Sequence, residues 1–170
     1  AQTFKHRGLK VTAVDSARYA ELFALCYVTI DAQEIDPDEL ATALAYLDAL
    51  PGEEGYVTEV FCRQARFFRP ENGCRIDAIR KSLDADFASS PLFPVLLTSL
   101  IEAADRVDST TGQQMAYLKQ WAPRAQRDLE LRRPELLSGT GRAIRGDALA
   151  LVREGSLGSF DLAYIDPPYN

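Results

Sequence analysis

The chain has 170 residues, of which 46% are hydrophobic and 26% charged, and its net charge is −6. This composition is ordinary for a soluble globular protein, and no apolar stretch approaches the roughly 18 residues that a membrane span needs. The three cysteines have no metal-ligand spacing and the chain has a single histidine, which argues against a disulfide framework and against a zinc site. We therefore expect buried thiols, as in proteins of a reducing compartment.

The first segment predicts a strand followed by a helix. Residues 9–14 alternate in polarity and are rich in β-branched side chains, which predicts a short strand ending at Asp15. Ser16 is suited to cap a helix that continues through about Val28. A carboxylate at the end of a Rossmann strand can accept hydrogen bonds from ribose hydroxyls. A helix-capping or loop aspartate is the alternative interpretation of Asp15.

The middle of the chain is predicted to be helical. Asp36-Pro37-Asp38-Glu39 is typical of a helix start, with a cap, a proline in the first turn and acidic residues at the positive end of the helix dipole. Helical spacing predicts two further helices, over residues 71–83 and about 92–107. The apolar positions of these helices are expected to form the core: Leu40, Ala43, Leu44, Leu47, Ile76, Ile79, Leu83, Leu92, Val95, Leu96, Leu100, Ala103 and Val107.

Basic residues gather in one part of this helical segment, among phenylalanines. The cluster consists of Arg63, Arg66, Arg69, Arg75, Arg80 and Lys81. Because the whole chain is acidic, any contact with nucleic acid must be local, and arginines among aromatic residues suit phosphate and base contacts. The alternative is a solvated helix face with a few phenylalanines in the core.

The last forty residues predict a β-α-β unit. Its parts are a strand over residues 142–145, a helix over about 148–153 and an apolar, buried strand over 160–165. Such units have parallel strands and a right-handed crossover. We therefore expect Asp147 and Asp166 to follow successive strands at one sheet edge, which is where open α/β sheets bind ligands.

The chain ends with Asp166-Pro167-Pro168-Tyr169-Asn170. The Asp166 carboxylate and the carbonyl between Asp166 and Pro167 can accept hydrogen bonds from the amino group of a planar base, while the Tyr169 ring stacks on its face. A plain Pro-Pro turn at the end of a strand is the alternative. The organisation as a whole is a strand-helix start (1–30), a helical insert (31–130) and β-α-β (131–170), which indicates one α/β domain interrupted by an insertion.

Three features resemble the Dam-like DNA adenine-N6 methyltransferases, in particular the branch found in type II restriction-modification enzymes. They are the ending over residues 161–170, the Gly146-Asp147 pair about twenty residues earlier, and motifs in the insert. The insert motifs are FFRPEN (67–72), RIDAIR (75–80), EAADRV (102–107), TTG (110–112) and AYLK (116–119). The similarity runs from about Val11 to the end of the chain.

The resemblance implies part of a Rossmann-like, S-adenosylmethionine-dependent methyltransferase sheet in residues 1–30 and 131–170, interrupted by a mostly helical insert. It implies that Asp15 holds the ribose and Asp147 the adenine ring of S-adenosylmethionine, and that Asp166 to Tyr169 bind a flipped-out adenine. The insert would recognise double-stranded DNA without a metal, in the cytoplasm of a prokaryote or of a phage-infected cell. Candidate DNA-binding residues are Arg63, Arg66, Arg69, Arg75, Tyr117 and Lys119.

The chain departs from the family pattern at both ends. No Phe-x-Gly-x-Gly loop precedes Asp15 and nothing follows Asn170, so we expect a piece of a longer enzyme that has no turnover by itself. Two alternatives remain: a non-catalytic DNA-binding module derived from such an enzyme, and a methyltransferase acting on a substrate other than DNA. An intact Asp-Pro-Pro-Tyr motif and the acidic charge balance argue against the module.

Overall fold

The computed structural model of the chain describes residues 1–111, 118 and 120–166. In this part of the chain a two-stranded parallel sheet is formed by β1 (Thr12–Asp15) and β2 (Arg142–Arg145). The strands are in register from Thr12 opposite Arg142 to Asp15 opposite Arg145. Two of the three predicted strands are confirmed, and their parallel pairing shows that a long helical segment leaves the sheet and returns to it.

The entry into β2 requires a glycine. A Cβ atom at Gly141 would lie 2.5 Å from the carbonyl oxygen of Val11 and 2.5 Å from Cγ1 of Val28. The next residue, Arg142, donates its main-chain N–H to the same Val11 carbonyl at 2.8 Å. Any side chain at position 141 would therefore push β2 away from β1.

Short helices surround the sheet. They are α1 (Gln2–His6), α2 (Arg18–Ala24), which continues as the π-helical η1 (Leu25–Thr29), and α6 (Ala148–Arg153). The predicted helix after β1 is confirmed, but the prediction that Ser16 caps it is wrong. The Asp15 carboxylate instead accepts the N–H of Ala17 at 2.7 Å, because a carboxylate two residues earlier reaches this donor directly.

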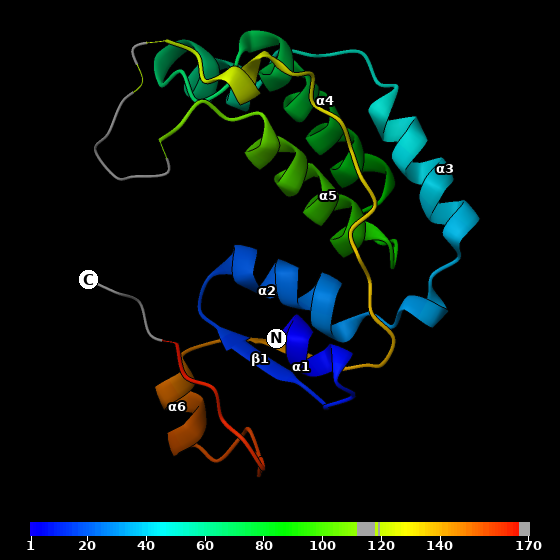
Figure 1. Cartoon of the computed structure of the whole chain (residues 1–170), viewed down its shortest axis with the longest axis vertical. Coiled ribbons are helices and arrows are strands. Elements are labelled where there is room, and N and C mark those ends of the chain that lie inside the picture. Colours follow the sequence, from blue (N-terminus) through cyan, green and yellow to red (C-terminus); the bar gives the residue numbers. More distant parts are fainter. Residues whose placement is uncertain (112–117, 119, 167–170) are drawn as a thin grey trace.

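The larger helices gather at the other end of the molecule (Figure 1). They are α3 (Pro37–Asp48), α4 (Pro70–Asp86) and α5 (Phe93–Arg106), accompanied by the short η2 (Ala32–Glu34), η3 (Val57–Gln64) and η4 (Pro123–Gln126). Asp36 caps α3 as predicted, since its Oδ1 accepts the N–H groups of Asp38 at 2.9 Å and Glu39 at 3.3 Å. The predicted helices are thus confirmed; α4 is longer than predicted at both ends, and α5 is one residue shorter at each end.

One hydrophobic core joins these helices. All the predicted core residues are buried except Leu44, which is half-buried against the core. Cys26 of η1 belongs to the same core, so the helix that follows β1 packs directly against the insert. Cys26 and Cys62 are buried free thiols as expected, and Cys74 is half-buried. The division into residues 1–30, 31–130 and 131–170 stays a prediction.

The chain returns to the sheet through an extended stretch, residues 127–137, which we call the return segment (Figure 1). Polar side chains of the helices bind its main chain. Asn72 of α4 donates to the carbonyl of Arg127 at 2.9 Å and accepts the N–H of Leu129 at 3.0 Å. Ser99 of α5 donates to the carbonyl of Arg132 at 2.7 Å and accepts its N–H at 3.1 Å. These side chains form hydrogen bonds with main-chain groups that a neighbouring strand would bind in a sheet.

The predicted strand over residues 160–165 is wrong. The segment has no regular secondary structure, and Phe160, Leu162, Tyr164 and Ile165 are 50%, 66%, 73% and 82% exposed. An apolar run forms a parallel strand only where a neighbouring strand shares its hydrogen bonds and other elements cover its faces. Within the described residues the segment pairs with neither β1 nor β2, and the ring of Tyr164 packs edge-on against Phe4 of α1 instead.

Candidate active site

Two of the predicted site residues, Asp15 and Asp147, come together at the carboxyl edge of the sheet. Asp15 ends β1, and Asp147 comes two residues after the end of β2, whose Arg145 lies opposite Asp15. The main-chain N–H of Gly146 donates to the Asp15 carbonyl at 2.9 Å, which holds the carboxyl ends of the two strands side by side. Parallel pairing therefore brings together two carboxylates that are far apart in the sequence.

Each of the two carboxylates uses one oxygen to organise the local backbone. Oδ1 of Asp15 accepts the N–H of Ala17, and Oδ1 of Asp147 accepts the N–H groups of Leu149 at 2.8 Å and Ala150 at 3.3 Å, which makes Asp147 the cap of α6. Both side chains are exposed. Within the described part of the chain the second oxygen of each has no partner. Each aspartate can therefore accept a hydrogen bond from a ligand hydroxyl or amino group.

Asp166 lies in the described part of the chain, but the residues before it form no strand. The expectation that Asp147 and Asp166 end successive strands is therefore wrong for Asp166. Pro167, Pro168 and Tyr169 lie outside the described residues. The role of the Asp-Pro-Pro-Tyr motif stays a prediction that rests on the sequence.

The insert is tied to the sheet side of the molecule by a polar contact. The hydroxyl of Tyr27 in η1 donates to the carboxylate of Glu102 in α5. Burial, and then this hydrogen bond, raise the pKa of Tyr27, so that the phenol stays protonated as a donor. The helix that follows β1 is thereby fixed against α5, and the carboxylate edge keeps a defined position relative to the helices of the insert.

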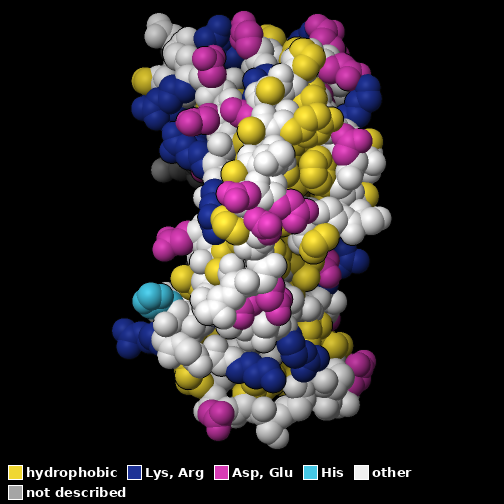
Figure 2. Space-filling model, turned by 90° about the vertical axis from the view of Figure 1, so that its right-hand side faces the viewer, with side chains coloured by type: hydrophobic (Ala, Val, Ile, Leu, Met, Phe, Trp, Pro, Cys, Tyr) yellow, Lys and Arg dark blue, Asp and Glu magenta, His cyan; other side chains and the backbone are white. Residues whose placement is uncertain are grey.

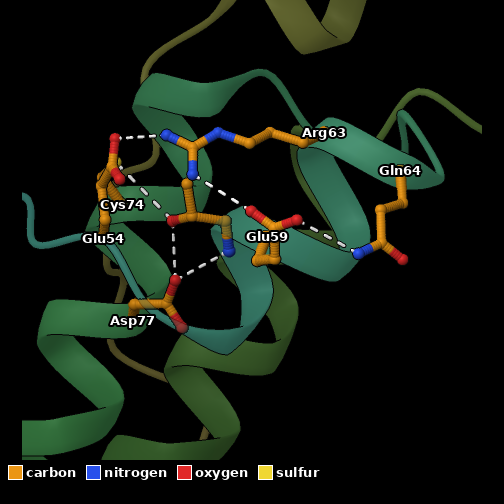
Figure 3. A network of polar contacts seen from close by, with 7 residues as sticks. Glu54, Glu59, Arg63, Gln64, Cys74 and Asp77 are labelled. Carbon is orange, nitrogen blue, oxygen red and sulfur yellow. Dashed lines mark hydrogen bonds and ion pairs between the residues drawn. The ribbon is translucent and has the colours of Figure 1, made fainter.

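Three of the predicted DNA-binding arginines, Arg63, Arg69 and Arg75, are engaged with carboxylates. Figure 3 shows the Arg63 guanidinium between Glu54, at 2.5 Å, and Glu59, at 3.1 Å. Hydrogen bonds from Gln64 and from Arg63 lower the pKa of Glu59, which keeps this carboxyl ionised. Arg75 is paired with Asp48 at 3.0 Å, and Asp48 also accepts the N–H of Leu131 in the return segment. These pairs are typical of a solvated helix face and of structural bracing, the alternative that the sequence left open.

The other predicted DNA-binding residues divide between the described and the undescribed parts of the chain. Arg69 contacts Glu71 at 3.3 Å and Gln126 at 3.0 Å. The guanidinium of Arg66 lies over the indole ring of Trp121, 5.1 Å from its centroid. Tyr117 and Lys119 lie outside the described residues.

Sequence reasoning missed three residues of the insert, of which Trp121 is the ring that Arg66 lies over. Trp121, Arg124 and Arg127 line a surface cavity of about 710 Å³, together with Thr110, Gln120 and Pro123. The signal that could have found them is the same as for the first cluster, an aromatic residue followed by arginines at short spacing in residues 121–127. The cavity places a second, separate group of arginines on the insert.

In the part of the chain that the structure describes, no group of three or more histidine, cysteine or acidic residues is arranged to hold a metal ion. The described helices are all too short or too polar to cross a membrane.

Comparisons with known proteins give the family. A family model described as "D12 class N6 adenine-specific DNA methyltransferase" matches residues 1–170. "Type II methyltransferase M.NlaIII" from Neisseria lactamica is 29% identical over 98% of this chain and 51% of its own length. "Type II methyltransferase M.FokI" from Planomicrobium okeanokoites is 37% identical over 61% of this chain and 16% of its own length.

A viral relative extends the comparison. "Type II methyltransferase M.CviAII" from Paramecium bursaria Chlorella virus 1 is 29% identical over 78% of this chain and 42% of its own length. The chain thus spans about half the length, or less, of the curated relatives that it matches. No solved structure gives a significant match. The resemblance noted in the sequence is confirmed: the chain belongs to the D12 class of N6 adenine-specific DNA methyltransferases.

Proposed function

We propose that the chain is part of a site-specific DNA methyltransferase that transfers a methyl group from S-adenosylmethionine to N6 of adenine in duplex DNA. The observation that carries the proposal is the family match over residues 1–170. The relatives' names, which describe type II methyltransferases and modification methylases, support a role as the modification part of a restriction-modification system. Such a role places the protein in the cytoplasm of a prokaryote or of an infected cell.

The carboxylate edge fits the cosubstrate. Ribose hydroxyls and the adenine amino group are hydrogen-bond donors, and Asp15 and Asp147 each offer an exposed carboxylate oxygen to a donor. We assign the ribose to Asp15 and the adenine ring to Asp147, at one edge of what we propose to be a Rossmann-like sheet in the intact enzyme. When bound, S-adenosylmethionine supplies a methyl group activated by its sulfonium.

The target adenine is assigned to Asp166, Pro167, Pro168 and Tyr169. The adenine amino nitrogen is a poor nucleophile because its lone pair is conjugated with the ring. Hydrogen bonds from its two hydrogens to the Asp166 carboxylate and to the carbonyl before Pro167 favour a more tetrahedral nitrogen and free the lone pair. Stacking on Tyr169 fixes the base, so that the nitrogen faces the methyl group. The departing proton goes to water, so Asp166 acts by orientation and charge rather than as a strong base.

The test uses the intact protein that carries these residues. Plasmid DNA free of methyladenine is incubated with the protein and methyl-labelled S-adenosylmethionine, then digested to nucleosides and analysed by mass spectrometry. We expect the label in N6-methyldeoxyadenosine. The label in a methylcytosine, or no incorporation into DNA, would contradict the proposal. Heat-inactivated protein is the control for carried-over methylated DNA.

A further inference from the structure

The basic residues of the insert differ in what they contact. Arg63 and Arg75 are ion-paired, as described above. Arg80 is also paired, with Asp84, and Lys81 is paired with Glu53 at 2.6 Å. Arg80 and Lys81 line a cavity that also includes Glu53, Glu54, Asp77 and Asp84, so carboxylates outnumber cations there. Figure 2 shows the same mixture over a wider area, with acidic and basic side chains interspersed on the face in view. A polyanion gains little from such a surface.

Arg66 differs from these residues in both its backbone and its partner. It is the one non-glycine residue among those described that has a positive φ, 55°. It follows the end of η3, where the N–H of Phe67 closes the last turn on the carbonyl of Phe61 at 2.7 Å. Glycine is favoured at this position of a helix end, because a Cβ is strained there. An arginine at such a position points to a use for its side chain.

The partner of Arg66 leaves its hydrogen-bond donors available. The guanidinium lies over the Trp121 ring and the side chain is exposed; among the described residues it has no carboxylate partner. A cation–π contact with the ring uses no carboxylate, so the N–H groups of the guanidinium remain available to an anion. The indole thus restricts the arginine without neutralising it, which lowers the entropy lost when an anion binds.

The cavity that Trp121 lines also includes Arg124 and Arg127 and, among its described lining residues, no carboxylate. Arg124 forms part of the wall: it donates to the carbonyls of Asp108 and Thr110, each at 3.0 Å, and pairs with the Asp108 carboxylate. Arg127 is exposed, and its side chain has no partner in the described part of the chain. Its backbone is held by Asn72, so the free guanidinium extends from a fixed point.

We propose that Arg127, which lines this cavity, and Arg66, which lies over the Trp121 ring of its wall, bind backbone phosphates of duplex DNA. The inference rests on the proposed function, and it replaces Arg63 and Arg75 as DNA contacts. Phosphate contacts position a protein on DNA and do not read its sequence. The two arginines thus set how the insert lies on the duplex, while base recognition belongs to other residues.

The test measures binding of a fluorescein-labelled duplex to the intact protein by anisotropy, over a series of salt concentrations. The variants are Arg66→Gly, Arg127→Gln and, as a matched control, Arg63→Gln, which removes the same charge from an ion-paired arginine. Each lost phosphate contact should reduce the slope of log affinity against log salt by about 0.9. We expect this reduction, and binding at least about fivefold weaker at low salt, for the first two variants. Arg63→Gln should bind like the parent protein.

Arg66→Gly also separates a structural role from a binding role. Glycine relieves the strained backbone, so the variant should melt at or above the temperature of the parent protein while it loses affinity for DNA. A loss of affinity with an unchanged salt slope, an equal loss in Arg63→Gln, or unchanged binding in Arg66→Gly and Arg127→Gln would each overturn the inference. A complete lack of DNA binding by the intact protein would overturn it as well.

The two proposals fail separately. Unchanged binding in both variants of a protein that still forms N6-methyladenine refutes the phosphate contacts and leaves the proposed function standing. If the two variants lose affinity for DNA in a salt-dependent way but the parent protein forms no N6-methyladenine, the phosphate contacts stand and the proposed function is refuted.

Discussion

Replacing Asn72 by alanine should destabilise the fold by removing the link between α4 and the return segment. The Asn72 side chain is 4% exposed and makes two hydrogen bonds, to the carbonyl of Arg127 and from the N–H of Leu129. Alanine leaves both main-chain groups without a partner, and Leu129 is itself 4% exposed, so water reaches its N–H poorly. At about 1.5 kcal/mol for each orphaned group, Asn72→Ala should lower the free energy of unfolding by about 3 kcal/mol.

Urea titration followed by circular dichroism measures this loss. The matched control is Thr42→Ala, which removes one exposed side-chain hydrogen bond within α3 and should change the free energy of unfolding by less than about 0.5 kcal/mol. Asn72→Asp keeps the acceptor for Leu129 but places a carboxylate oxygen against the Arg127 carbonyl, so it should not rescue stability. An Asn72→Ala variant as stable as the Thr42→Ala control would refute the reasoning.

Three further predictions concern packing, ionisation and capping. Gly73→Ala should cost about 2 kcal/mol of stability, because its Cβ would lie 2.2 Å from Sγ of Cys62. Urea titration of the double variant with Cys62→Ala should show that part of this stability is recovered. No recovery in the double variant would contradict a clash with Cys62. Burial raises the pKa of the Cys26 and Cys62 thiols from an ordinary 9.0 to about 11. The unfolded chain therefore loses these protons first, and the free energy of unfolding should fall as the pH rises from 9 through 11; a flat profile would contradict this. Asp147→Ala should cost about 1 kcal/mol by removing the cap of α6, and calorimetry on the intact protein should show weaker S-adenosylmethionine binding.

Local signals predicted much of the fold. The alternation before Asp15 and the short run over residues 142–145 predicted both strands, since each is flanked by residues that end a strand. The Asp36-Pro37 start predicted α3 because the cap and the proline act within one turn. The β-α-β order predicted a parallel partner for β2, but placed it at residues 160–165. The observed parallel partner is β1, and this pairing brings Asp15 and Asp147 to one edge.

The remaining features depend on residues that are distant in the sequence. The apolar run over residues 160–165 has the pattern of a buried strand, but burial depends on elements that cover it, and in the described residues the segment pairs with neither strand and stays exposed. Arg63 and Arg66 look equivalent in the sequence. Only the folded chain shows that Arg63 meets Glu54 nine residues away, whereas Arg66 meets Trp121. The π-helical turns η1 and η3 were not predicted, because over five to eight residues their apolar spacing differs little from that of an α-helix.

The rate of methyl transfer to adenine by the intact protein and its Asp166→Ala variant tests the account most directly. Single-turnover transfer from labelled S-adenosylmethionine to duplex DNA should fall at least about 100-fold in Asp166→Ala, because the positioned carboxylate is lost. A variant at the exposed Glu154, Glu154→Ala, should keep the parent rate. Near-normal N6-methyladenine formation by Asp166→Ala would contradict the assignment of the target adenine to this end of the chain.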